Sequence, residues 1–315
     1  MKRFKNILLY TDGKEESRFA LKRAVDLASR NQGRLTVVGV LEELPRDLLR
    51  LAAVLPSENL QSMAMQDLRV KLERFVAPFQ EKGSPLKVEV LYGKSFIEII
   101  RAVLRRQHDL VLLTAEGGSG PLPMLFGSTS LHLMRKCPCP VWVLKPSAPA
   151  RFARILAAVD PDPLDVVRHG VNTKVLELAT SLARLEASEL HIVHAWELCD
   201  PTLWRGWQAR VAEAQVRDWA EQTREAHQRR LDELVGQFDL ETLRPRLHLV
   251  QGEAGVVIPQ LAAEQQIDLI VMGTVARTGL DGYFIGNTAE TVLQRVACSV
   301  LTVKPDGFVS PVKPD

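Results

Sequence analysis

The sequence contains one segment twice, and this repeat constrains the fold more than any other feature. Residues 109–146 and 268–305 align without a gap, so that Asp109 corresponds to Asp268 and Lys145 to Lys304. Both pairs are separated by 159 positions (268 − 109 and 304 − 145). A constant offset over a whole strand–loop–helix–strand unit indicates duplication of a domain. The chain is therefore expected to fold as two copies of one architecture.

The length of the chain agrees with a duplication. Its 315 residues give room for about two domains that each bury a core. We place the first domain at 1–146 and the second at 150–315. The connection between them contains Pro146 and Pro149 and offers little reach. The two domains are therefore predicted to pack together as an intramolecular pseudo-dimer.

Each half alternates short β-rich runs with longer amphipathic segments, which is typical of βα units on a parallel sheet. In the first half we predict strands at 6–11, 35–40, 87–91, 110–114 and 141–144. In the second half we predict strands at 155–160, 190–195, 246–250, 269–273 and 300–303. Apolar residues recur at helical spacing over 95–107, which predicts a helix packed on the sheet. The predicted fold class is α/β, with a five-stranded, mostly parallel, Rossmann-like open sheet flanked by helices in each domain.

Charge and hydropathy patterns argue against several classes of protein. A formal net charge of +2 gives no electrostatic basis for binding nucleic acid. The N-terminal apolar run is too short for a signal peptide and ends at Asp12, so it is interpreted as the first strand. No stretch approaches the roughly 20 apolar residues that span a bilayer. We therefore expect a cytoplasmic protein with neither nucleic acid nor a membrane among its partners.

The cysteines and histidines do not predict a metal site. The four cysteines form no disulfide framework. Cys137 and Cys139 flank a proline as a metal clip does, but no matching Cys or His pair stands at zinc-site spacing, so buried thiols are the favoured interpretation. The seven histidines, including His191 and His194, are expected to be structural or solvated.

A glycine-rich loop follows the fourth strand of the second half. That strand ends at Gly273, and Gly279, Gly282 and Gly286 come before the next helix. Glycines let backbone amides approach an anion closely, and a helix N-terminus adds N–H groups and the positive end of a dipole. In an open parallel sheet, ligands bind beyond the carboxyl ends of the strands where the strand order reverses. This loop is therefore the candidate phosphate-binding element.

These loops resemble the Gly-x2-Gly-x9-Gly-Ser/Thr loop of ATP-binding members of the universal stress protein family. The segment GNTAE at 286–290 and the ending VLTVKPDGFVSPV at 300–312 are similar to the tandem E-type members in particular. The resemblance implies a stress-response protein with a binding rather than a catalytic role, and it implies ATP with Mg²⁺ as the candidate ligand. It also implies pairing of the two domains through their fifth strands, 141–144 and 300–303.

Neither loop matches the family motif completely. In the second domain Gly273 and Gly286 match, whereas Ala276 stands at the second glycine. Asn287 stands at the hydroxyl residue and is followed by Thr288. The resemblance implies a nucleotide-binding site in the second domain at these positions: Asp160, Ala195, Gly273, Ala276, Gly286, Asn287 and Thr288. Arg277, directly after Ala276, is added as a candidate because its guanidinium could bind phosphate with two hydrogen bonds, although a solvent-facing arginine is the default.

In the first domain the same comparison gives a weaker second site. Thr114 replaces the first glycine, while Gly117, Gly127 and Ser128 match the motif. The implied positions are Asp12, Val40, Thr114, Gly117, Gly127 and Ser128. Two equal ATP sites are therefore not expected.

Several of these residues also have a purely structural interpretation. Asn287 and Glu290 have the spacing of a capping box, with Asn287 as the N-cap of the last helix. In the family the aspartate matching Asp12 or Asp160 lies near the adenosine end of the nucleotide, but each could instead cap the following turn or helix. Ser128 could be a simple N-cap. Both interpretations stay open at this point.

Three functions are compatible with these patterns. The leading hypothesis is a protein that binds ATP, another adenine nucleotide or another anionic ligand in its second domain. A slow ATP hydrolase is the second, although neither first strand is followed by the Ser-Gly-Gly-x-Asp-Ser loop of related ATP-splitting enzymes. The third is a ligand-free interaction protein that binds a partner along the helix predicted at 204–238, near Trp204 and Trp207. A homodimer of the chain is compatible with each of them.

Overall fold

The computed structural model describes residues 4–43, 57–80, 85–115, 126–146, 148–149, 151–162, 165–198, 213–274 and 286–314. The chain divides into two compact units. One is formed mainly by residues up to 150 and the other mainly by residues 151–307. Each is described by itself.

The first unit is an open parallel sheet. Its strands are β1 (Asn6–Tyr10), β2 (Arg34–Leu41), β3 (Leu86–Tyr92), β4 (Leu110–Thr114) and β5 (Val141–Leu144). They are arranged in the order β3-β2-β1-β4-β5, and every neighbouring pair is parallel. The helical elements are η1 (Glu15–Ser17), α1 (Arg18–Asn31), α3 (Ser57–Gln80), α4 (Ser95–Arg106) and α5 (Ser128–Lys136).

The second unit repeats this arrangement. Its strands are β6 (Arg154–Ala158), β7 (Glu189–Trp196), β8 (Arg246–Gln251), β9 (Leu269–Gly273) and β10 (Ser299–Val303). Their order is β10-β9-β6-β7-β8, again with parallel pairs. The helices are α6 (Val166–Glu186), α8 (Glu213–Val235), α9 (Ala254–Glu264) and α10 (Asn287–Arg295). The predicted α/β fold with five strands per half is confirmed.

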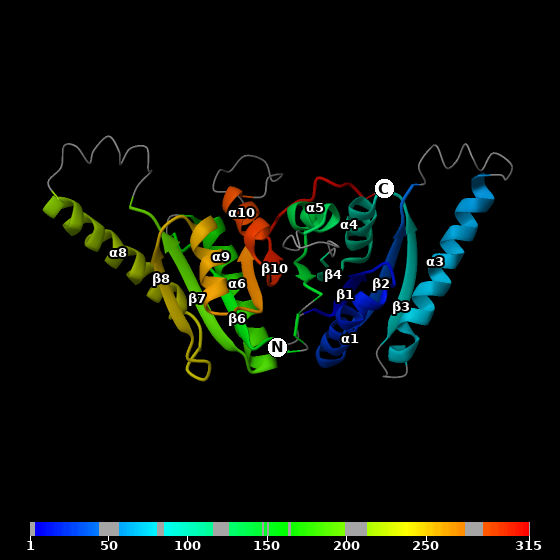
Figure 1. The fold of residues 1–315 in the computed structure, drawn as a ribbon, viewed down its shortest axis with the longest axis horizontal. Helices are drawn as coiled ribbons and strands as arrows, with labels where there is room; N and C mark the ends of the chain where they lie inside the picture. Colours follow the sequence, from blue (N-terminus) through cyan, green and yellow to red (C-terminus); the bar gives the residue numbers. More distant parts are fainter. Residues whose placement is uncertain are drawn as a thin grey trace. The chain divides into compact units, whose positions relative to one another are not determined.

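Helices cover both faces of each sheet (Figure 1). In the first unit α1 contacts α3, and α4 contacts α5. The crossovers from β1 to β3 and from β3 to β5 run in opposite directions along the sheet, so right-handed connections put these two pairs of helices on opposite faces. Strands covered on both faces need apolar side chains throughout, and the residues of β4 and β9 are accordingly buried, apart from partly exposed Thr114 and Gly273 at their ends.

The repeated aspartate has the same structural role in both units. The carboxylate of Asp109, just before β4, accepts hydrogen bonds from the backbone N–H groups of Lys5 (2.7 Å) and Asn6 (3.0 Å). Asp268, just before β9, accepts from Ala153 (2.7 Å) and Arg154 (2.9 Å) in the same way. Each carboxylate therefore sets the start of the fourth strand beside the start of the first. This contact gives a physical reason for one of the identities in the repeat.

Some expected boundaries differ from those observed. β6 ends at Ala158, so Asp160 follows the strand instead of ending it. The helix predicted over 95–107 is confirmed as α4, and Gln107 forms its left-handed C-cap (φ 52°). The described part of the helix predicted at 204–238 is α8, while Trp204 and Trp207 lie outside the described residues. Packing of the domains as a pseudo-dimer stays a prediction.

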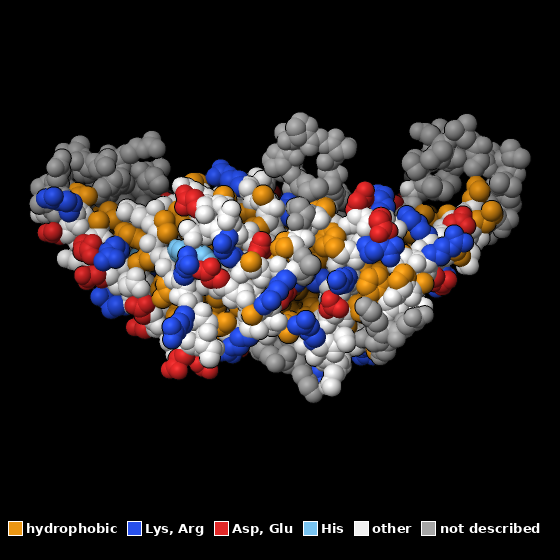
Figure 2. Space-filling view, turned by 60° about the horizontal axis from the view of Figure 1, so that its bottom comes forward, with side chains coloured by type: hydrophobic (Ala, Val, Ile, Leu, Met, Phe, Trp, Pro, Cys, Tyr) orange, Lys and Arg blue, Asp and Glu red, His pale blue; other side chains and the backbone are white. Residues whose placement is uncertain are grey.

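Charged side chains of both signs are interspersed over the face drawn in Figure 2, as the small net charge leads one to expect. Within the described ranges, no helix is long and apolar enough to cross a membrane.

Candidate functional site

The carboxyl ends of the strands in the second unit form a topological switch point. The chain leaves β6 through α6 to reach β7 on one side, and it returns from β8 through α9 to β9 on the other side. The strand order therefore reverses between β6 and β9. This is the place where open parallel sheets bind ligands. The described residues of the implied site lie at or just after the ends of these strands or at the start of α10, whereas Ala276 and Arg277 lie outside the described residues.

The N-terminus of α10 begins with a glycine. Gly286 is the N-cap, with φ −62° and ψ 142°, and as a glycine it has no side chain that could cap the helix. The Gly286 N–H donates to the carbonyl of Thr274 (3.1 Å), and the Glu290 N–H donates to the carbonyl of Gly286 (3.0 Å). Asn287 is thus the first helical residue and not the N-cap, so the capping-box interpretation is wrong. The first-turn amides of a helix have no partner within it and can face an anion.

Gly273 has a packing role at the end of β9. A Cβ at this position would lie 2.5 Å from Cγ1 of Val171 on α6, which is far closer than van der Waals contact allows. The absence of a side chain lets the helix approach the strand closely. In the first unit Thr114 stands at the corresponding place. Its Oγ1 is buried and makes no hydrogen bond within the described residues.

Asp160 belongs to an acidic cluster around one arginine. The Arg168 guanidinium lies 3.4 Å from Asp160, 3.3 Å from Asp162 and 3.0 Å from Asp165. Asp165 is the N-cap of α6, because its side chain accepts from the Arg168 N–H (3.0 Å). Asn172 holds the Asp160 backbone through its N–H (3.0 Å) and carbonyl (2.9 Å). The helix cap proposed for Asp160 is therefore formed by Asp165, and the Arg168 guanidinium contacts all three carboxylates.

Buried His194 and half-buried His227 lie beside this cluster, and sequence reasoning missed their pairing. The Nδ1 of His194 on β7 lies 3.3 Å from the Val159 carbonyl, and its Nε2 lies 2.8 Å from Nδ1 of His227 on α8. A carbonyl only accepts, so Nδ1 of His194 carries its proton and Nε2 accepts from His227. Burial lowers the pKa of His194 to about 4. Trp196 stacks on His227 with ring centroids 5.6 Å apart, next to Ala195 at the end of β7.

The corresponding site in the first unit is organised differently. The Asp12 carboxylate accepts from the Lys14 N–H (3.1 Å) and pairs with its ammonium (2.7 Å), so it caps the turn after β1. Burial acts to raise the pKa of Asp12, but the hydrogen bonds and charge of Lys14 outweigh it and hold that pKa below its usual value. Gly127 is the N-cap of α5 and exposed Ser128 begins the helix without a side-chain cap. Val40 is half-buried, and Gly117 lies outside the described residues.

A buried lysine follows the fifth strand of each unit. Lys304 is 6% exposed, and its ammonium donates to Oγ1 of buried Thr274 over 2.6 Å. Lys145 is 2% exposed, and its ammonium lies 4.2 Å from the centre of the Phe126 ring. Thr274 and Phe126 lie immediately beside the ends of the two glycine loops. The exact repetition of the lysine at both positions was the signal that could have identified it.

The described residues hold no group of three or more His, Cys, Asp or Glu side chains that could bind a metal ion. The Sγ atoms of Cys137 and Cys139 are 3.5 Å apart, and both are free thiols, with Cys137 buried. A hydrogen bond with Cys137 and, to a smaller extent, burial raise the pKa of the Cys139 thiol well above its usual value. These are properties of inert structural thiols.

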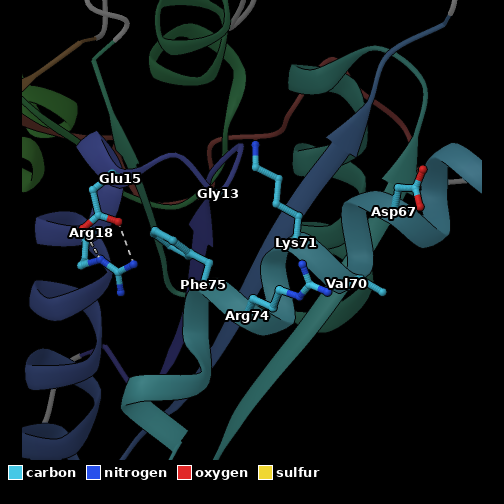
Figure 3. Close-up of a pocket in the computed structure, with 8 residues that line it drawn as sticks. All are labelled: Gly13, Glu15, Arg18, Asp67, Val70, Lys71, Arg74 and Phe75. Carbon is cyan, nitrogen blue, oxygen red and sulfur yellow. Dashed lines mark hydrogen bonds and ion pairs between the residues drawn. The ribbon is translucent and has the colours of Figure 1, made fainter.

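A cleft in the first unit was also missed by sequence reasoning. It lies between the start of α1 and the side of α3, and it is bordered by Gly13 but not by Asp12 (Figure 3). Its side chains come from η1 and α1 on one side and from α3 on the other, and α3 is far from the other two in sequence. No spacing motif marks such a cleft.

Comparison with known proteins places this fold. The profile of the universal stress protein family matches residues 3–145 and 151–304. Universal stress protein E of Photorhabdus laumondii is 27% identical over 316 residues, which cover 99% of each chain. Universal stress protein E of Escherichia coli K12 is 26% identical over 317 residues, which cover 100% of this chain and 98% of the relative.

Solved structures agree with the sequence comparison. A functionally unknown protein from Pseudomonas aeruginosa PAO1 superposes with a TM-score of 0.67 at 26% identity, covering 98% of this chain and 95% of the other. A universal stress protein from Archaeoglobus fulgidus has a TM-score of 0.60 at 21% identity, with 95% and 98% covered, and is alike in fold.

Because the family profile matches both halves, the chain belongs to the universal stress protein family. Two family domains in tandem and full-length agreement with the E-type relatives make it a tandem member of the E type.

Proposed function

We propose that this protein acts in the stress response by binding ATP, another adenine nucleotide or another anionic ligand in its second domain. The proposal takes 1–146 and 150–315 as the two domains and a cytoplasmic location. One observation carries it. In the second unit, the ends of β6, β7 and β9 meet the start of α10 where the strand order reverses, and the buried ammonium of Lys304 lies beside this point.

The chemistry of the surrounding groups supports a nucleotide. Amides at the start of α10, beside Gly286, suit a phosphate. Asp160 can accept hydrogen bonds from ribose hydroxyls, and half-buried Ala195 leaves room for a flat base near Trp196. Carboxylates such as Asp160 and Asp162 are also the oxygen donors that Mg²⁺ prefers. Ala276, Arg277, Asn287 and Thr288 complete the proposed set, and Asp12, Val40, Thr114, Gly117, Gly127 and Ser128 remain the proposed weaker site.

The way in which the nearby bases are held supports binding without catalysis. The Asp160 carboxylate pairs with Arg168, and both ring nitrogens of His194 are engaged by Val159 and His227. A general base must be free to take a proton from the attacking water. Asp160 and His194 therefore supply no such base, and a binding role is the better proposal.

Thermal denaturation with saturating Mg-ATP tests the proposal. A ligand that binds only the folded state at 100 times its Kd stabilises it by about 2.7 kcal/mol, which raises the Tm by several degrees. We expect this rise in the wild type and its loss in the double variant Asp160→Ala, Gly286→Val. The matched control is Asp12→Ala, Gly127→Val in the first domain, which should keep most of the rise.

Other outcomes would redirect the proposal. An unchanged Tm of the intact protein with ATP, ADP and AMP would favour the ligand-free interaction protein. Phosphate release that survives purification and disappears in the second-domain double variant would instead show a slow ATP hydrolase. Pairing through the fifth strands and a homodimer of the chain stay predictions.

A further inference from the structure

The cleft between α1 and α3 has the size of a small-molecule site. Its volume is about 450 Å³, within the roughly 300–1,000 Å³ of typical ligand pockets. One wall is formed by the turn at Gly13 and by Arg18, and the other by Val70, Lys71, Arg74 and Phe75 of α3 (Figure 3). All of these residues belong to the first unit, so the cleft is independent of the second-domain site.

An apolar floor and a neutral wall give the cleft a fixed shape. Phe75 is 4% exposed, and the Arg18 guanidinium lies 5.4 Å from the centre of its ring. Arg18 also forms a two-point ion pair with Glu15, with distances of 2.5 and 2.7 Å. The charge of Arg18 is thus already compensated. Its role at the cleft is to hold the wall over the phenyl ring.

The opposite wall carries two cationic side chains, Lys71 and Arg74. Lys71 and Arg74 lie one turn apart on α3 and therefore face the same side of the helix. The Lys71 ammonium donates to the backbone carbonyl of Asp12 over 2.6 Å. No ion pair joins Lys71 or Arg74 to a carboxylate among the described residues. Asp67 lies one turn before Lys71 on α3, and its carboxylate is turned away from Arg74 (Figure 3).

We propose that this cleft binds a small phosphate monoester with an apolar body. The planar guanidinium of Arg74 matches two phosphate oxygens, and Lys71 adds a second positive charge one turn away. A phosphate monoester carries about 1.5 to 2 negative charges at neutral pH, which suits two cations that form no ion pair among the described residues. Its organic part packs on Phe75 and Val70. Asp160 and Gly286 take no part, so this inference stands apart from the proposed second-domain site. Of the weaker first-domain set, Asp12 is the neighbour of the cleft, through its carbonyl contact with Lys71.

Titration of the full-length protein with phenyl phosphate, followed by amide chemical shifts, tests the proposal. We expect saturable shifts of residues on α3 and in the turn at Gly13. Arg74→Glu should raise the Kd by about tenfold or more, since it replaces a bidentate cation with a repelling carboxylate. The matched control is Arg69→Glu on the same helix, which makes the same change of charge outside the cleft and should alter the Kd by less than about twofold.

Two further ligands and one further variant test whether the cleft needs both halves of the ligand and whether the second-domain site is involved. Phenol and inorganic phosphate should each bind more weakly than phenyl phosphate, because each lacks one half of the ligand. The Asp160→Ala, Gly286→Val variant should bind phenyl phosphate as the wild type does, whether or not it has lost the ability to bind ATP. Equal losses in Arg74→Glu and Arg69→Glu, absence of saturable shifts, or loss of binding in the second-domain variant would each overturn the proposal.

Discussion

The ammonium of Lys304 donates a hydrogen bond of 2.6 Å to the hydroxyl of Thr274, and both side chains are buried. Lys304 follows β10 and Thr274 follows β9, so this bond joins the ends of two neighbouring parallel strands. The Thr274 carbonyl also accepts from the Gly286 N–H at the start of α10. The contact therefore connects the fifth strand to both ends of the glycine loop.

A double-mutant cycle should detect this contact. Lys304→Met removes the donor and leaves a buried hydroxyl behind, which typically costs about 1–3 kcal/mol. When Lys304→Met is combined with Thr274→Val, urea unfolding of the single and double variants should give a coupling energy between the two side chains above about 0.5 kcal/mol. Strictly additive losses would show that the two side chains act independently.

Gly273→Ala should destabilise the second unit for a steric reason. The new methyl group would lie 2.5 Å from Cγ1 of Val171, and such overpacking costs about 1–3 kcal/mol. Val171→Ala should restore part of the loss when it is combined with Gly273→Ala, because it removes the colliding methyl. Urea unfolding of the single and double variants measures this effect. Failure of the rescue would mean that the glycine is needed for another reason.

Stability should fall as the pH drops from about 6.5 towards 4. Burial lowers the pKa of His108 to about 4, and the charges of Arg106 and Arg34 contribute smaller effects. Burial also lowers the pKa of His194 to about 4. The unfolded chain takes up these protons near pH 6.5, so below that pH it binds more protons than the folded chain. Each histidine should cost on the order of 2 kcal/mol of unfolding free energy by pH 4.5.

Urea unfolding of wild type, His108→Gln and His194→Gln between pH 8 and 4.5 measures this dependence. Both variants lose stability at pH 8, because hydrogen bonds are removed, but each should show a flatter decline below pH 6.5. A decline as steep as that of the wild type in both variants would assign the acid sensitivity to other groups.

Arg168→Met should destabilise the second unit by about 1 kcal/mol or more at pH 7, because its partly exposed ion pairs lie between surface pairs (about 0–1 kcal/mol) and buried pairs (about 3–5 kcal/mol). It leaves Asp160, Asp162 and Asp165 without their shared cation. Arg224→Met removes an exposed pair with Glu221 on α8 and serves as the control with little effect. Hydrogen exchange at the start of α6 reports the change locally.

Much of the fold was predictable because its signals are local. β4, β5 and β9 coincide with the predicted 110–114, 141–144 and 269–273, since a buried parallel strand is a short continuous apolar run. The constant offset of the repeat predicted that both halves share one topology. It could not show that Asp109 and Asp268 each bind the backbone before the first strand of their own unit.

The candidate site was predicted only in part. The positions of Gly273 and Gly286 followed from the motif, but their physical roles did not. Gly273 is required by its distance from Val171, a residue about a hundred positions earlier in the chain. The pairing of His194 with His227 likewise depends on α8 packing against β7. Neither contact has a periodic or spacing signal.

By itself, the sequence determined the duplication, the alternation of strands and helices, the family and the loop at which a ligand is expected. These follow from periodicity and from a repeated pattern, which are properties of neighbouring residues. Only the tertiary structure decided that Gly286 and not Asn287 caps α10, that Arg168 serves three carboxylates, and that Lys71 and Arg74 face a cleft. Those outcomes depend on distances between side chains that the chain brings together only when the sheet and its helices have packed.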